Sequence, residues 1–86
     1  MENIQFPTIP QLINSLVLAI RNNHGVATNQ EIKEFVITSL SLSPEQVSLV
    51  HEGNRTKLDY RLAWARTKAK EQGLILKDGP GKWRTV

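Results

Sequence analysis

The residues around position 55 have the side-chain types that proteins use to recognise DNA. Asn and Arg side chains can form paired hydrogen bonds with adenine and guanine edges in the major groove. A Thr at a helix start, with the free amides of the first turn, suits a phosphate. Further along, two cations alternate on a strand-like segment, where they can contact the backbone or enter the minor groove. We therefore expect DNA contacts from Asn54, Arg55, Thr56, Lys57, Tyr60, Arg61, Lys82 and Arg84.

No constellation for catalysis is visible in the sequence. His24 and His51 stand in separate predicted loops without a metal-spaced partner, and the chain has no cysteine. The carboxylates are scattered, and Glu31 and Asp59 suit the first turns of helices, where the dipole favours an acid. The glycines near residue 80 lack the Lys-Ser/Thr and helix of a phosphate-binding loop. We expect no catalytic residue, no metal and no cofactor, and hence no enzyme activity in this chain.

Positive charge is concentrated in the second half of the chain. Residues 51–86 hold nine Lys/Arg and four acids, whereas residues 1–50 hold two Lys/Arg and four acids. The net charges are therefore +5 and −2, and they add to the overall +3. A basic helix followed by a basic hairpin is typical of a small domain that meets a phosphate backbone.

Apolar spacing and capping signatures predict the elements that position these residues. Thr28 with Glu31, and Ser43 before Pro44, are helix-start patterns, and Thr56 precedes the longest helix. A loop is expected at residues 51–54, after a short helix that ends near residue 50. The predicted helices cover about residues 10–23, 29–41, 44–50 and 57–72, and the predicted strands residues 25–27, 74–76 and 82–86.

The helical wheel of residues 57–72 separates a buried stripe from two charged flanks. We expect the inward set to be Leu58, Leu62, Ala65 and Ala69. One flank then carries Lys57, Arg61, Trp64 and Lys68, and the other carries Arg66 and Lys70 beside Asp59. Trp64 either packs under the inserted short helix, together with Val47 and Val50, or contacts a ligand. Trp83 alternates inward and is expected in the core.

The element order predicts a mostly α fold with a small β-hairpin. Helix, short strand, helix, inserted short helix, long helix and hairpin together describe a winged helix-turn-helix. We expect one domain over residues 1–86, with residues 1–9 as an extended lead-in.

Several motifs together resemble the N-terminal winged-helix domain of Mrr-type restriction endonucleases. They are Gly53-Asn54-Arg55 before a helix, Trp64-Ala65-Arg66, Gly73-Leu74-Ile75 and Gly81-Lys82-Trp83-Arg84-Thr85. The resemblance spans nearly the whole chain and implies a DNA-recognition domain ahead of a nuclease domain. Any nuclease activity would then reside in a domain absent from this chain.

Two functional hypotheses follow. The first is a module that binds double-stranded DNA, with helix 57–72 in the major groove and wing 77–84 on the backbone, as a homodimer or tethered to a nuclease domain. The alternative is a winged-helix module for protein–protein interaction or dimerisation, anchored by Phe6, Tyr60 or Trp64. No signal peptide or membrane-spanning run is visible, so we expect a cytoplasmic protein without a membrane partner.

Overall fold

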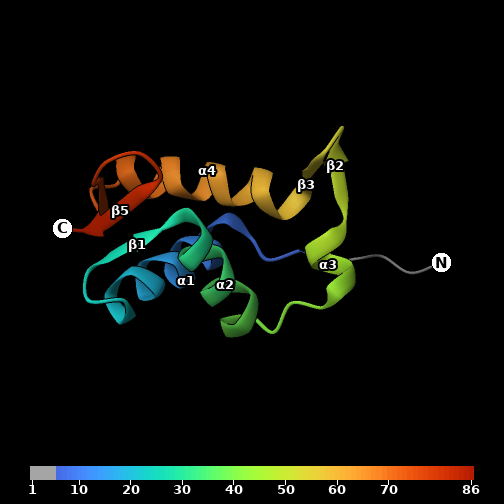
Figure 1. Cartoon of the computed structure of the whole chain (residues 1–86), viewed down its shortest axis with the longest axis horizontal. Helices are drawn as coiled ribbons and strands as arrows, with labels where there is room; N and C mark the ends of the chain where they lie inside the picture. The colour runs from blue at the N-terminus through green and yellow to red at the C-terminus, as the bar shows by residue number, and fades with distance from the viewer. Residues whose placement is uncertain (1–5) are drawn as a thin grey trace.

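The computed structural model describes residues 6–86, so the first five residues of the expected lead-in lie outside it. Helices dominate, and the strands form two small antiparallel sheets (Figure 1). The expectation of a mostly α fold with a small β-hairpin is confirmed. In chain order the elements are α1 (Ile9–Asn22), β1 (Val26–Thr28), α2 (Asn29–Ser39), α3 (Pro44–Ser48), β2 (Val50–Glu52), β3 (Arg55–Thr56), α4 (Lys57–Glu71), β4 (Ile75–Lys77) and β5 (Lys82–Thr85).

Side-chain caps fix where the helices begin. The capping boxes expected at Thr28 and Ser43 are present, since each side chain accepts a bond from the third helical amide and a Glu or Gln side chain reaches back. A third box, formed by Thr8 and Gln11, starts α1 at Ile9. The expectation that the extended lead-in runs to residue 9 is therefore wrong, because Pro10 is the more visible start signal in the sequence.

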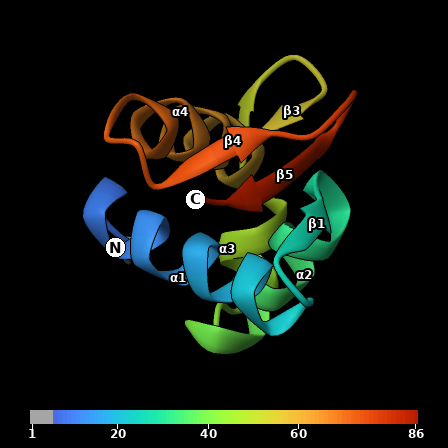
Figure 2. The same ribbon diagram turned by 90° about the vertical axis from the view of Figure 1, so that its left-hand side faces the viewer.

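The larger sheet joins distant parts of the chain in the order β1-β5-β4. Figure 2 shows the β4–β5 hairpin beside α4, with β1 completing the sheet next to β5. Trp83 pairs with Ala27 and Lys77, and only 8% of its surface is exposed, which confirms its expected core position. Lys82 and Arg84 are exposed and alternate with Trp83, so they share the opposite face of β5.

One hydrophobic cluster lies between α1, α2, α4 and the larger sheet. The expected inward stripe of α4 is buried. Helix α1 buries the apolar positions Leu12, Ile13, Leu16, Val17 and Ile20. From α2 only Ile32 and Val36 are buried, while Phe35 and Leu40 pack at the edge of the cluster. Burial at helical spacing therefore fixes which side of each helix faces inward.

The segment between α3 and α4 differs from the expectation. Residues 51–54 do not form a simple loop, because β2 and β3 pair as a short hairpin with Gly53 at φ 56° in its turn. The helix expected to reach residue 50 ends at Ser48, where Leu49 becomes extended and its carbonyl accepts a bond from Lys57 N at 2.8 Å. Val50 is 63% exposed, so its predicted role as an apolar anchor is wrong. Val47 does pack against the core.

Among residues 6–86, no helix has the length and apolar character required to cross a membrane.

Candidate nucleic-acid interface

Helix α4 is fixed at its start by Thr56 and along its length by its buried stripe. The Thr56 hydroxyl accepts a hydrogen bond from Asp59 N at 3.2 Å, which is the expected cap. With Leu58, Leu62, Ala65 and Ala69 held inward, the remaining side chains divide into an outward face and two flanks. The β2–β3 hairpin continues from one end of the helix, and β5 lies near the other (Figure 1).

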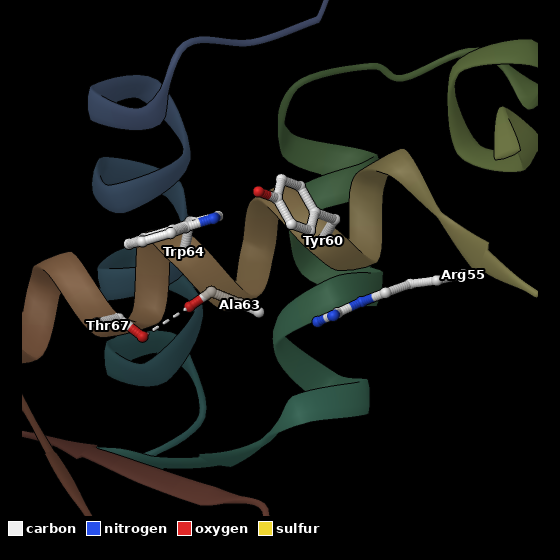
Figure 3. Close-up of a pocket in the computed structure, with 5 residues that line it drawn as sticks. All are labelled: Arg55, Tyr60, Ala63, Trp64 and Thr67. Carbon is white, nitrogen blue, oxygen red and sulfur yellow. Dashed lines mark hydrogen bonds between the residues drawn. The ribbon is translucent and has the colours of Figure 1, made fainter. Parts of the chain in front are cut away.

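The outward face of α4 carries a shallow pocket of about 240 Å³ between two aromatic side chains. Figure 3 shows Tyr60 and Trp64 projecting from the helix, with Arg55 extending from β3 alongside them. The pocket lining is Arg55, Tyr60, Ala63, Trp64 and Thr67. This set combines one guanidinium with two rings and two small side chains, which suits stacking and contact with apolar groups.

Trp64 is 47% exposed and does not pack under α3. A side chain that does lie against α4 here is His51 of β2. Its ring stacks on Tyr60 with centroids 4.1 Å apart, one turn before Trp64. The structural alternative for Trp64 is therefore wrong, and its ring is left accessible. The Arg55 guanidinium lies 5.6 Å from the Tyr60 ring centroid, so the short hairpin holds Arg55 against the helix.

The flank of α4 that faces α2 holds a second, polar cleft of about 260 Å³. Lys33 of α2 forms an ion pair with Asp59 at 2.9 Å across it. Burial raises the pKa of Asp59, but hydrogen bonds from Lys33 and Thr56 and the charges of Lys33 and Arg55 outweigh burial and lower this pKa overall. Arg66, which is half-buried, also lines the cleft.

The opposite flank of α4 faces the start of the described chain. Lys57 Nζ lies 5.1 Å from the Phe6 ring centroid, and Lys68 pairs with Glu71 at 3.9 Å. Arg61 is half-buried on this flank. Lys57 and Arg61 are therefore on the side away from Asp59 and Arg66, as the helical wheel indicated.

The β4–β5 hairpin is attached to the start of α2 through Asn29. Its side-chain oxygen accepts a bond from Trp83 Nε1 at 2.8 Å, and its backbone amide donates to Gly81 O at 2.9 Å. Lys77 Nζ lies 5.0 Å from the Trp83 ring centroid. The pKa of Glu31 is lowered, first by the hydrogen bond from the Thr28 amide and finally by the charge of Lys82. Asn29 thus links the hairpin with the polar cleft, which it also lines.

The eight residues that the sequence singled out do not form one patch. Arg55 and Tyr60 meet on the outward face of α4, and Asn54 is exposed in the turn that precedes Arg55. Thr56 serves as the helix cap, Lys57 and Arg61 occupy one flank, and Lys82 and Arg84 lie on the outer face of β5.

The polar cleft also contains Asn29, Gln30 and Lys33, which the sequence did not indicate because they lie in its acidic half. Within the described chain, no three His, Cys, Asp or Glu side chains are grouped so as to hold a metal ion.

Comparison with known proteins agrees with the resemblance seen in the sequence. Searches of curated proteins and of solved structures gave no match. The family model of the Mrr N-terminal domain matches residues 11–85, which is nearly the whole chain and includes every element apart from the first two residues of α1. The chain therefore belongs to the Mrr N-terminal domain family.

Proposed function

We propose that this chain is a winged-helix domain that binds double-stranded DNA within a restriction system. In this proposal α4 enters the major groove, and the β4–β5 hairpin is the wing that contacts the backbone. The family membership supports the restriction context. The observation that carries DNA binding is the arrangement of α4, whose accessible outward face lies between two flanks that each carry cations.

This arrangement matches the shape of the groove. A helix in the major groove lies between two phosphate backbones and presents its outward face to the base edges. Arg55, Tyr60 and Trp64 are then the residues nearest the bases, with Asn54 beside them. Lys57 and Arg61 would approach one backbone strand, and the residues that line the cleft toward α2 would approach the other. The Thr56 hydroxyl is occupied by the helix amide, so we assign it the positioning of α4.

Binding to a fluorescent duplex at two salt concentrations tests the proposal. We expect the affinity to fall steeply with salt, because cations that neutralise phosphates release counterions. The double variant Arg55→Ala/Arg61→Ala should bind at least about tenfold more weakly, since each good base or phosphate contact contributes about 1–3 kcal/mol. A matched double variant, Arg21→Ala/Lys70→Ala, removes the same charge from exposed positions at the ends of α1 and α4. It should stay close to the parent.

Binding that does not depend on salt, or equal affinities for the two double variants, would contradict the proposal. The exposed Trp64 ring favours one other function, a protein-interaction module anchored by aromatic side chains. Sedimentation of the protein without DNA separates the two. Self-association that Trp64→Ala abolishes, together with absent duplex binding, would support the interaction module instead.

A further inference from the structure

We propose that the cleft between α2 and α4 is a specific binding site for one phosphodiester group of the DNA backbone, with Lys33 and Arg66 as the residues that bind it. The inference rests on the proposed function and assigns DNA contacts to two residues that were not among the contacts expected from the sequence. It also replaces a diffuse basic surface by a defined anion site.

The cleft lies between two parts of the chain that are distant in the sequence, namely α2 and the continuous segment of β3 and α4. The start of α2, strand β3 and the middle of α4 line it, through Asn29, Gln30, Lys33, Arg55, Asp59, Leu62 and Arg66. Its volume of about 260 Å³ is ample for a phosphate group. Because both helices are fixed by the core, Lys33 and Arg66 enter the cleft from a rigid frame.

The charges in the cleft do not balance. Lys33, Arg55 and Arg66 contribute three positive charges, and Asp59 contributes the one carboxylate. The Lys33–Asp59 ion pair at 2.9 Å uses that carboxylate. The charge of Asp59 also acts on both guanidinium groups, so three cations share one carboxylate and the lining keeps a net charge of +2. A phosphodiester with its single negative charge would reduce this excess.

Arg66 shows the imbalance most clearly. The pKa of Arg66 is lowered overall. Burial is the main cause and the Arg55 charge adds to it, whereas the Asp59 charge acts in the opposite direction. Among residues 6–86 its guanidinium makes no hydrogen bond and no ion pair. Its donors reach the solvent, since Ser15 Oγ is the one buried side-chain polar atom without a partner among the described residues. They are therefore accessible to a ligand, and a guanidinium can bind two oxygens of a phosphate at once.

The amides at the start of α2 are not the basis of this site. Thr28 and Glu31 satisfy each other's amides, and the Asn29 amide donates to Gly81. What α2 offers is side chains. The Trp83 indole occupies the Asn29 oxygen, which leaves the Asn29 NH₂ group as a donor at the cleft. The hydrogen bond between Trp83 and Asn29 also fixes the β4–β5 hairpin beside the cleft.

The salt dependence of duplex binding measures this contact. Each phosphate contact contributes about 0.9 to the slope of log K against log salt concentration. We expect Arg66→Gln and Lys33→Gln each to lower that slope by about this amount. Lys70→Gln removes the same charge from an exposed site one turn further along α4 and should leave the slope nearly unchanged. Circular dichroism checks that the variants remain folded.

A duplex series in which one phosphate at a time is replaced by an uncharged methylphosphonate gives a test that leaves the protein intact. At one position the replacement should weaken binding of the parent protein but have little further effect on Arg66→Gln. Absent salt-sensitive binding by the parent would contradict DNA binding itself. Two other outcomes would leave DNA binding intact but contradict the phosphate site. In the first, Arg66→Gln, Lys33→Gln and Lys70→Gln all give the same salt slope. In the second, no methylphosphonate position affects the parent protein more than Arg66→Gln.

Discussion

Asn29 shows how one side chain can hold three parts of this molecule together. It is the first residue of α2, it accepts the indole N–H of Trp83, and it lines the cleft that contains Arg66. In the sequence it is only a polar residue after a helix cap. Its importance comes from a contact across 54 positions of the chain.

We expect Asn29→Ala to destabilise the fold by about 1–3 kcal/mol, because the nearly buried Trp83 N–H would lose its acceptor. The neighbouring Gln30→Ala is the matched control, since Gln30 bonds only to Glu34 on the exposed side of α2. It should change stability by less than about 0.5 kcal/mol. Urea denaturation followed by circular dichroism measures both variants. Equal midpoints for the two variants would show that the Trp83 hydrogen bond contributes nothing.

The carboxyl groups of Glu31 and Asp59 make stability depend on acid pH. Both pKa values are lowered in the fold, so the folded protein binds protons less readily than the unfolded chain. Their stabilisation is complete above the unfolded pKa values of about 3.9–4.3 and is lost as pH falls through the lower folded values. Urea midpoints should therefore be nearly constant from about pH 5 to 7 and fall below about pH 4.

Glu31→Gln supplies the control for this pH dependence. A Gln side chain can also complete the capping box but does not titrate over this range. The variant should show a smaller fall at acid pH than the parent protein. Parallel curves for the two proteins would mean that Glu31 does not contribute.

At the scale of elements, the position of α4 depends on its cap as well as on its buried stripe. Thr56→Ala should lower stability by about 1 kcal/mol, because the Asp59 amide would lose its acceptor. Thr67→Ala on the same helix is the control, since the Thr67 hydroxyl bonds only to the Ala63 carbonyl behind it. Ala favours helix formation more than Thr, so this change should be neutral or slightly stabilising. Thermal unfolding of both variants gives the comparison.

The segment from α3 to β3 should open more readily than the other elements. Between Val36 and Leu58 no residue is buried, and the β2–β3 hairpin packs mainly on α4. Local opening there exposes little apolar surface, so amide exchange should be faster than in α1 or α4. Hydrogen exchange followed by NMR measures this directly. Protection of β2 and β3 equal to that of α1 would show that the hairpin unfolds only with the whole protein.

At the scale of the molecule, the described chain surrounds one core, so we expect it to unfold in a single cooperative transition. Leu62→Ala removes a fully buried side chain from α4 and should cost about 2–5 kcal/mol. Tryptophan fluorescence and circular dichroism should report the same midpoint in the parent and in the variant. Separate midpoints for the two probes would contradict the expectation of a single domain.

The sequence by itself determined the four helices and the strands of the larger sheet, the inward side of α4, the core position of Trp83 and the family. These features depend on local signals, namely caps, turn residues and apolar spacing, which act within one or two turns of the chain. The β2–β3 hairpin was not predictable in this way, because its two very short strands carry no alternating apolar pattern.

Tertiary structure alone decided which cations meet. Helical periodicity gives the angle of Lys57 or Arg66 around α4 but does not say which neighbour each side chain faces. The packing of α2 against α1 and the attachment of the β4–β5 hairpin through Asn29 bring Lys33 to the same cleft as Arg66. Trp64 stays exposed on the outward face of α4. Contacts between residues far apart in the chain set these outcomes, because the free energy of burying the common core selects one arrangement of the elements.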